Sequence, residues 1–418
     1  MSKNQTRQLI RRLRLQVSIL LLLSSITNAF GQKYDLLIKG GHVIDPANGI
    51  DKIMDVAISK GNIAKVAVNI AEPAEKTIMA KGLYVTSGFI DMHTHVFVGT
   101  NAGLFANGVN SVSPDDFTFR SGVTTVVDAG TSGWRNFPMF KKQVIDESKT
   151  RILAFVNIAG DGMTGEAHEQ NIADMHPDSV LPVVNRYAET IVGIKIGHFN
   201  GSDWTPFDNA VKAARTVEKP LFVECHLPQY SLEDQLGRLV AGDMITHTFE
   251  NIKERMPIIG EDGKVRPFVL EAKKRGVLFD LGHGGAGFWF DQAAPAIKQG
   301  FTPNSFGTDL HRFSMNSAMK DMSNVMSKFM ALGLSLDDVV RIATWNAAEA
   351  LMHDELGNLK VGNVADLAIF RVREGTFGFM DSAGISISGT KKIEVEMTIR
   401  DGKVVWDLNG LGAKKTDF

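Results

Sequence analysis

The sequence predicts an α/β protein in which a (β/α)8 TIM barrel is joined to a small β-sandwich domain built from both ends of the mature chain. Three observations support this fold class. Short apolar runs recur through the middle of the chain, segments of helical periodicity separate them, and strands with glycine turns occur near both ends. A chain of 418 residues fits one barrel of roughly 250 residues plus a smaller domain.

The predicted barrel strands are short apolar runs that are bounded by turns or helical segments. They are Phe89–His95, Thr124–Asp128, Ile152–Asn157, Ile191–Ile196, Leu221–Cys225, Met244–His247, Leu278–Leu281 and Ser305–Asp309. Between them, residues 206–218 and 335–352 place their apolar side chains on one helical face, so each is expected to form a helix.

The predicted sandwich takes its strands from the two ends of the chain. Residues 34–85 alternate short apolar runs with glycine turns, which is typical of an antiparallel sheet. Residues 365–370 and 395–404 show the same pattern, the second as a hairpin around Asp401-Gly402. The expected domains are a signal peptide over 1–31, a β-sandwich over 32–85 plus 360–418, and a hydrolase barrel over 86–359.

The first 31 residues resemble a cleaved signal peptide. Four arginines precede an apolar run from Val17 to Leu23, and small residues follow around Gly31. The run is shorter than the roughly 20 residues that span a bilayer, which argues against an uncleaved anchor. We expect cleavage near Gly31 and a secreted or periplasmic protein. Cys225, the single cysteine, excludes an intrachain disulfide and a lipid-anchored cysteine at the cleavage site.

The balance of acidic and basic side chains indicates which classes of partner the protein can bind. The chain has 45 basic and 47 acidic side chains, so nothing indicates the polycationic surface that nucleic acids or anionic membranes select. We expect a small-molecule acylated substrate as the partner, no nucleic acid, and no membrane for the mature form. Assembly into a homo-oligomer is left open.

His93 and His95 are the first candidate metal ligands. They are two residues apart at the end of an apolar strand, and a strand of period two projects both side chains from the same face. If that face looks into the barrel, both imidazoles can meet one ion. Two ordinary histidines are the alternative, but the position at a strand end followed by a loop favours ligands.

Lys195 is the second candidate. Alternation along residues 191–197 points Lys195 inward between Gly193 and Gly197. A buried, unpaired ammonium costs several kcal/mol, so this lysine needs a partner or must become neutral. Two solutions remain open. Carbon dioxide can carbamylate the amine into a carboxylate-like bridge between two cations, or the lysine can pair with an acid inside the barrel mouth.

Three further candidates lie at the ends of predicted strands: His226 directly follows one, and His247 and Asp309 are the last residues of two others. Each alone has an ordinary structural explanation. Together they are expected at the carboxyl-terminal ends of barrel strands, where barrel enzymes build their sites. No Gly-x-Ser-x-Gly elbow or phosphate-binding glycine loop indicates another chemistry.

The donor set suits two divalent ions, with zinc as the expected metal. In this hypothesis, one ion is held by His93, His95 and Asp309, the other by His226 and His247, with Lys195 and a water shared between them. The ions would lower the pKa of the bridging water and so create a hydroxide nucleophile. Asp309 would act as general base and then as general acid.

Residues 88–95, followed in order by Lys195, His226, His247 and Asp309, resemble the amidohydrolase superfamily. The resemblance implies a carbamylated Lys195 that bridges two zinc ions. Residues 34–41 and 43–46 are similar to the dihydroorotase, hydantoinase and D-aminoacylase branch. Residues 280–284 and 307–311 are most similar to the amidohydrolase/deacetylase metallohydrolase group, which acts on acylated hydroxy or amino acids.

The expected function is therefore zinc-dependent hydrolysis of an amide or ester bond in a small acylated amino or hydroxy acid. The candidate partners of the substrate carboxylate are His283, His311 and Arg312. One alternative is a cyclic amide hydrolase of dihydroorotase or hydantoinase type, although export would separate it from pyrimidine biosynthesis. Others are a deaminase of the same superfamily and a non-catalytic dihydropyrimidinase-like scaffold.

Overall fold

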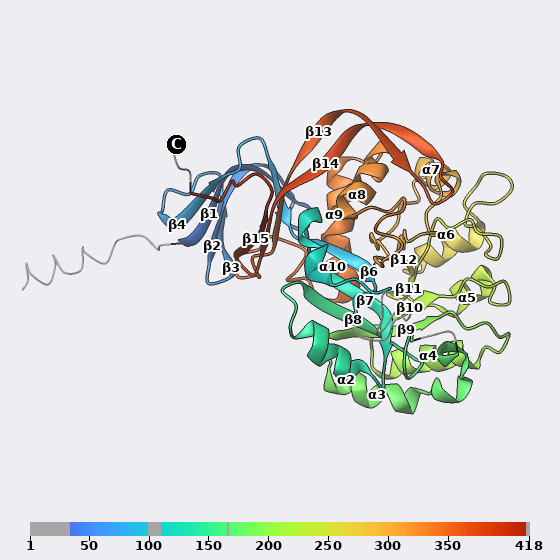
Figure 1. The fold of residues 1–418 in the computed structure, drawn as a ribbon. Coiled ribbons are helices and arrows are strands. Elements are labelled where there is room, and N and C mark those ends of the chain that lie inside the picture. Colours follow the sequence, from blue (N-terminus) through green and yellow to red (C-terminus); the bar gives the residue numbers. More distant parts are fainter. Residues whose placement is uncertain (1–33, 99–109, 165–166, 415–418) are drawn as a thin grey trace, which may run out of the picture.

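The computed structural model describes residues 34–98, 110–164 and 167–414. The predicted signal peptide over 1–31 lies outside the described residues, so cleavage and export stay predictions. Figure 1 shows two bodies side by side, a sheet domain that contains both ends of the described chain and a larger body built around a curled parallel sheet.

The larger body is the predicted barrel. In the described ranges, its sheet contains seven parallel strands in the order β12-β11-β10-β9-β8-β7-β6, so each strand lies beside its neighbour in sequence. The strands are β6 (Phe89–Thr94), β7 (Val123–Gly133), β8 (Arg151–Asn157), β9 (Ile191–Gly197), β10 (Leu221–Glu224), β11 (Met244–Ile245) and β12 (Leu278–Phe279). This order is that of a β/α barrel unrolled, and it confirms the predicted fold class.

Residues 305–310 close the ring without forming a regular strand. Ser305 makes a parallel bridge to Asp280 on one side, and Leu310 makes one to Thr94 on the other. Thr308 donates from its backbone nitrogen and its hydroxyl to the two carboxylate oxygens of Asp91 on β6, at 2.8 and 2.5 Å. We call this junction between residues 305–310 and β6 the seam. It takes the place of the eighth predicted strand.

Helices cover the outside of the barrel (Figure 1). They are α2 (Phe137–Phe140), α3 (Pro177–Arg186), α4 (Thr205–Thr216), α5 (Leu232–Arg238), α6 (Pro267–Lys274), α7 (Phe290–Lys298), α8 (Met322–Ala331), α9 (Leu336–Ala343) and α10 (Trp345–Leu351). The single helix predicted over 335–352 is in fact α9 and α10, because the backbone of Thr344 leaves the helical region. The Thr344 hydroxyl donates to the carbonyl of Val340, a bond that competes with the helix backbone.

The sheet domain combines the two ends of the chain. Within the described residues its order is β15-β14-β13-β5-β1-β2-β3, with β4 beside β1. The strands are β1 (Tyr34–Asp45), β2 (Ile50–Ser59), β3 (Asn62–Ala67), β4 (Ala74–Met79), β5 (Tyr84–Ser87), β13 (Leu367–Met380), β14 (Ser386–Arg400) and β15 (Lys403–Asp407). The sheet is mixed rather than purely antiparallel, since β1 runs parallel to β4 and β5.

The hairpin of β13 and β14 is much longer than the sequence indicates. Figure 1 shows it arching from the sheet domain over the barrel to α8. There the backbone nitrogen of Ile393 donates to the hydroxyl of Ser327 at 2.9 Å. The hairpin thus joins the two bodies through packing as well as through the chain.

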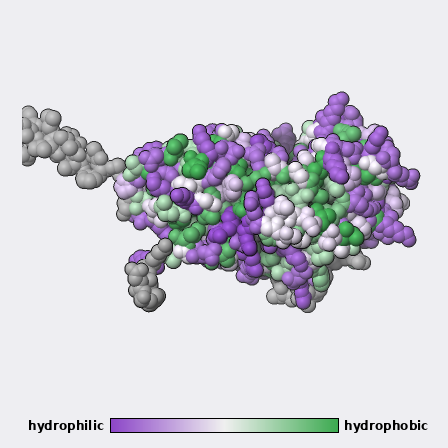
Figure 2. Space-filling view, turned by 90° about the horizontal axis from the view of Figure 1, so that it is seen from above, coloured by the Kyte–Doolittle hydropathy of each residue, from purple (hydrophilic) through white to green (hydrophobic). Residues whose placement is uncertain are grey.

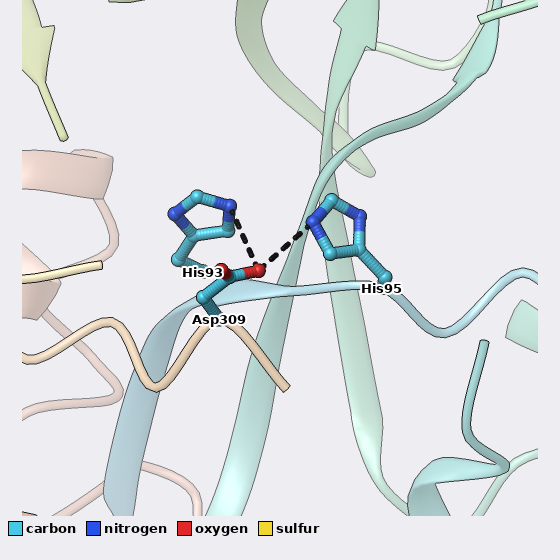
Figure 3. Close-up of side chains that lie close together, drawn as sticks. All are labelled: His93, His95 and Asp309. Atoms are coloured by element: carbon cyan, nitrogen blue, oxygen red, sulfur yellow. Dashed lines mark ion pairs between the residues drawn. The ribbon is translucent and has the colours of Figure 1, made fainter. Parts of the chain in front are cut away.

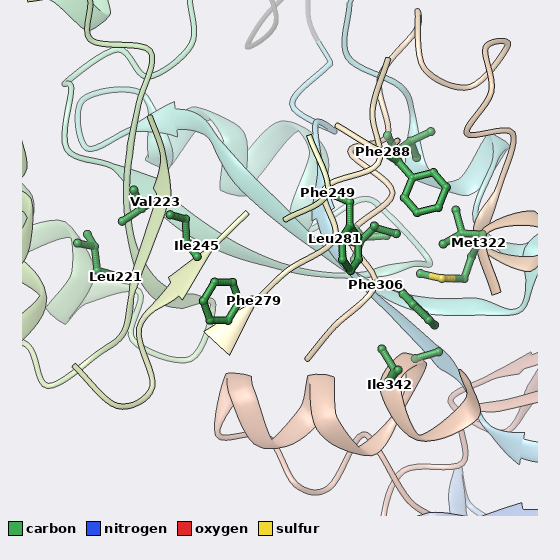
Figure 4. Packing of buried hydrophobic residues seen from close by; sticks show 14 of the residues in the cluster. Leu221, Val223, Ile245, Phe249, Phe279, Leu281, Phe288, Phe306, Met322 and Ile342 are labelled. Carbon is green, nitrogen blue, oxygen red and sulfur yellow. The ribbon is translucent and has the colours of Figure 1, made fainter. Parts of the chain in front are cut away.

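Apolar packing holds the helices against the barrel. Figure 4 shows buried side chains from β10 to β12, from the segments that follow them and from α8 and α9, and they belong to one apolar cluster that includes Phe279, Phe306 and Ile342. Seen from above, hydrophilic residues dominate the surface and hydrophobic residues lie in separated patches (Figure 2). Every helix of the described ranges is too short or too polar to cross a bilayer.

Candidate metal centre

The predicted ligands come from different strands and meet at the carboxyl-terminal end of the barrel. His93 lies on β6, with His95 just after it, and Lys195 lies on β9. His247 follows β11, and Asp309 lies on the closing segment beside β6. Among the described residues, three groups of histidines and acids bring their ligand atoms within 4.8 Å of one another.

The first group is His93, His95 and Asp309, all buried (Figure 3). Oδ1 of Asp309 lies 3.1 Å from Nε2 of His95 and 3.6 Å from Nε2 of His93. Both imidazoles therefore aim the same nitrogen at one carboxylate oxygen. The sequence hypothesis assigned these three residues to one ion, and the structure brings them together.

A threonine holds the other side of each imidazole, Thr246 for His93 and Thr131 for His95. Nδ1 of His93 lies 3.0 Å from the hydroxyl of Thr246, which itself donates to Asp280 at 2.8 Å. Because that hydroxyl has only one proton, it accepts from Nδ1 of His93, and the proton of this imidazole is therefore on Nδ1. Nε2 then presents a lone pair. It is buried and has no hydrogen-bond partner in the described part of the chain, as expected of a nitrogen prepared for a cation.

The centre contains a residue that the sequence hypothesis missed. Glu224, the last residue of β10, points into the barrel and belongs to both remaining groups, His93-Glu224-His247 and His198-Glu224-His226. Its Oε1 lies 3.0 Å from Nε2 of His247, 3.4 Å from Nε2 of His226 and 3.3 Å from Nε2 of His198. Three imidazole nitrogens thus surround one carboxylate oxygen.

Carboxylates also orient the two outer imidazoles. Nδ1 of His226 lies 2.8 Å from Glu250, and Nδ1 of His198 lies 3.3 Å from Glu169. A carboxylate behind an imidazole fixes the ring and raises its basicity, an arrangement that is common around metal sites. His198 is therefore a candidate ligand that the sequence hypothesis also missed.

Lys195 is fully buried and has two partners. It forms an ion pair with Glu224 and donates to the carbonyl of Ala129 at 2.8 Å. Its side chain passes Gly130, where an added Cβ would lie 2.4 Å from Cγ of Lys195, and Gly130 has a φ of +80°. The acid that sequence reasoning left open as a partner is thus present.

Electrostatics keep the acids of the centre ionised. Burial raises the pKa of Glu224, but Lys195 and His198 lower it by more, so its pKa lies well below the usual range. Burial likewise raises the pKa of Asp309, while His93 and His311 lower it to a net value far below normal. Both side chains are therefore anionic at neutral pH.

Backbone strain concentrates at the same place. His198, His247 and Asp309 have φ values of 56°, 54° and 50°, which place them in the left-handed region. Such conformations cost free energy in residues other than glycine and cluster at functional sites. Here they turn the chain sharply after strands, so that side chains beyond the strand ends still face the barrel axis.

A cavity of about 760 Å³ opens above the centre and is bordered by His95, Glu224, His247 and Asp309. Of the three proposed substrate contacts, the structure brings only His311 to its wall, with Nε2 3.9 Å from Oδ2 of Asp309. Arg312 is exposed and does not line the cavity.

His283, the third proposed substrate contact, is also off the cavity wall. It is fully buried, and its Nε2 lies 2.7 Å from Nζ of Lys328 on α8. Burial and the nearby Lys328 lower the pKa of His283 well below its usual value. His283 therefore contacts a buried lysine and does not face the cavity.

Because Lys328 is buried, we expect the free energy of unfolding to depend on pH. Burial lowers the pKa of Lys328 from 10.5 to about 7. Between these values the unfolded chain binds more protons, so the free energy of unfolding rises with pH. Lys328→Met removes this dependence. The free energy of unfolding of the variant minus that of the native protein should therefore increase by about 3 kcal/mol when the pH is lowered from about 10 to about 7. Denaturant unfolding at each pH measures both free energies. If the free energies of unfolding of the variant and the native protein changed with pH in parallel, this prediction would be wrong. Lys274→Met, at an exposed position, is the control.

The comparisons with known proteins agree with this geometry. Residues 290–405 match the amidohydrolase family. A protein from Brucella anthropi named deacetylase is 32% identical over 344 residues, which cover 80% of this chain and 83% of the relative. The chain belongs to the amidohydrolase family. This amidohydrolase is thus a metal-dependent hydrolase.

Solved structures agree as well. The crystal structure of an adenine deaminase has a TM-score of 0.82 and 28% identity over 90% of this amidohydrolase and 100% of that chain. The crystal structure of a dihydroorotase has a TM-score of 0.79 and 28% identity over 88% and 98%. Two solved structures that are named for different activities, a deaminase and a dihydroorotase, thus share this fold.

The residues of this amidohydrolase fit divalent metal ions. The buried lone pair of His93, the shared oxygen of Asp309 and the imidazoles around Glu224 form a nitrogen and oxygen donor set of the kind such ions prefer. His93, His95 and Asp309 would hold one ion, and Glu224 with His198, His226 and His247 would surround a second.

Proposed function

We propose that this amidohydrolase is a zinc-dependent deacylase that hydrolyses the amide or ester bond of a small acylated amino or hydroxy acid. The observation that carries the proposal is the convergence of His93, His95 and Asp309 beside Glu224 and its imidazoles, at the floor of a cavity. The relative from Brucella anthropi named deacetylase supports the acyl-bond assignment.

The roles of the side chains follow from their positions. Divalent ions, when bound, lower the pKa of a water molecule and polarise the scissile carbonyl. Asp309 borders the cavity as an anionic carboxylate, so it can accept the proton of the attacking water and return it to the leaving group. Thr246 holds the imidazole of His93 in one tautomer and orientation during these steps.

The ligand shared by the two ions has two candidates. A carbamylated Lys195 stays a prediction from the family resemblance. Glu224 is the second candidate, because its two oxygens lie among donors of both groups.

Substrate recognition is proposed at the cavity wall. Of the three candidate substrate contacts, His311 is the one that can meet a substrate carboxylate, since Arg312 and His283 lie off the wall. The cavity volume of about 760 Å³ suits a small molecule. Export remains part of the proposal, and it places the reaction in the periplasm or outside the cell.

A paired measurement of metal content and acyl hydrolysis tests the proposal. The purified protein is expected to contain about two equivalents of zinc and to release acetate from a panel of N-acetyl and O-acetyl acids. Elemental analysis and an acetate assay give the two readouts. Metal content near zero, or no hydrolysis across the panel by zinc-loaded protein, would contradict the proposal.

Cyclic amide hydrolysis is the second candidate, and the similarity to a dihydroorotase structure favours including it. Dihydroorotate and hydantoins in the same panel test it by ring opening. Ammonia release from adenine tests the deaminase alternative that the first solved structure represents. A non-catalytic scaffold would turn over none of these compounds.

A further inference from the structure

Residues 285–287 form part of the wall of the cavity, and we call them the wall segment. The backbone of Gly287 packs against the centre, since an added Cβ at this position would lie 2.3 Å from Nδ1 of His247. Gly285 is exposed, and apart from its chain neighbours an added Cβ there would meet no heavy atom of the described residues within 4 Å. The position of the wall segment therefore sets how much room the cavity leaves beside the centre.

The barrel fixes both ends of the wall segment by backbone hydrogen bonds. Before it, the nitrogen of Gly284 donates to the carbonyl of Thr308 at the seam, at 3.0 Å. After it, Trp289 has an extended backbone, with φ of −127° and ψ of 132°, and its nitrogen donates to the carbonyl of Phe249 at 3.0 Å. An extended residue directs its backbone groups to both sides, so a second neighbour can bind the opposite edge.

The sheet domain supplies this second neighbour. It is the turn between β13 and β14, residues 381–385, which we call the hairpin tip (Figure 1). The backbone nitrogen of Ser382 donates to the carbonyl of Phe288 at 2.9 Å, and the nitrogen of Phe288 donates to the hydroxyl of Ser382 at 3.3 Å. The nitrogen of Phe290 donates to Oδ2 of Asp381 at 2.9 Å. The chain that leaves the wall segment thus lies between the barrel and the hairpin tip.

The two oxygens of Asp381 accept hydrogen bonds from different segments. Oδ1 accepts from the backbone nitrogens of Ala383 and Ile385, at 3.0 and 2.8 Å, and so shapes the hairpin tip. Oδ2 accepts from Phe290, the first residue of α7, whose nitrogen has no partner within the helix. A contact that only capped α7 would end there. The two bonds of Ser382 extend it to the residue that directly follows the wall segment.

We propose that the hairpin tip, through Asp381 and Ser382, holds the wall segment in place and thereby helps to select which acylated acids enter the cavity. Both are positioning residues, because they act on the substrate through the backbone of residues 288–290. The role in selection rests on the proposed deacylase function, whereas the hold on the wall segment does not.

Hydrogen exchange followed by mass spectrometry tests this hold. Asp381→Asn keeps one oxygen for the two nitrogens of the hairpin tip and turns an amide NH₂ toward the nitrogen of Phe290. Ser382→Ala removes the hydroxyl that accepts from Phe288. In the double variant, we expect residues 284–290 to exchange about tenfold faster than in the native protein, because two hydrogen bonds are lost. Unchanged exchange would overturn the proposal.

The matched control is Ser388→Ala, an exposed serine on β14 outside the hairpin tip. It should leave the exchange of residues 284–290 as it is in the native protein. Circular dichroism establishes that each variant is folded. If the double variant does not fold, Ser382→Ala alone replaces it, since Ser382 is only half-buried, and unchanged exchange in that variant would equally overturn the proposal.

Kinetics test the role in selection with a large and a small acylated acid. Gly285→Leu should place a side chain in the cavity and lower kcat/KM for N-acetylphenylalanine about tenfold more than for N-acetylglycine. In the background of Asp381→Asn and Ser382→Ala the wall segment can yield, so this factor should fall to about threefold or less. A loss of stability alone would lower both values and leave their ratio unchanged. The same factor in both backgrounds would overturn the role in selection.

The two measurements separate this inference from the proposed function. If zinc-loaded native protein hydrolysed no compound of the acyl panel, the proposed function would be wrong, and the role in selection with it. The exchange measurement needs no substrate, so it would still decide whether the hairpin tip holds the wall segment.

Discussion

Replacing Asp309 by asparagine is expected to lower kcat/KM for an acylated acid by about 10²–10⁴-fold, the range for loss of a general acid–base group. Asparagine keeps an oxygen near His95 but cannot accept a proton from the attacking water. Steady-state kinetics on the best substrate of the acyl panel give the measurement. Elemental analysis of the same sample separates the loss of proton transfer from the loss of zinc.

The matched control for this variant is Asp262→Asn, since Asp262 lies in an exposed turn and does not line the cavity. It should keep the native kcat/KM. If Asp309→Asn retained zinc and stayed within tenfold of the native rate, the proton-transfer role of Asp309 would be wrong.

Removal of the metal ions is expected to abolish hydrolysis and to lower Tm. In the proposed centre the cations balance the charge of the buried carboxylates of Glu224 and Asp309 and accept the lone pair of Nε2 of His93, which has no hydrogen-bond partner among the described residues. A ligand present at 100 times its Kd stabilises the folded state by about 2.7 kcal/mol, and this contribution disappears with the ions. Dialysis against a chelator, followed by calorimetry and the acetate assay, measures both effects.

Zinc added back should restore Tm and activity together. Protein carried through the same dialysis without chelator is the control. Full activity in protein that elemental analysis finds free of metal would contradict the metal-dependent mechanism.

The barrel and part of its centre could be predicted from the sequence because they depend on local periodicity. The alternation of β6 puts His93 and His95 on one side, and apolar runs mark each parallel strand. The seam could be located from the run ending at Asp309, although its hydrogen bonds are too irregular for a strand.

Glu224 and His198 were missed for different physical reasons. In Glu224-Cys225-His226, the sequence does not say where the strand ends, and histidine is the more familiar ligand. The structure ends β10 at Glu224, so this residue takes the inward place and His226 lies two residues beyond. His198 faces the centre because its backbone adopts a φ of 56° after β9, a turn that side-chain periodicity does not encode.

The seam joins parts of the chain that are remote in sequence, since Asp91 and Thr308 are 217 residues apart. The proposed first ion takes donors from both sides of the seam: His93 and His95 from one, Asp309 from the other. A folding intermediate with an open seam would hold only the two imidazoles and bind zinc weakly. Zinc uptake during refolding should therefore be a late event that reports when the ring closes.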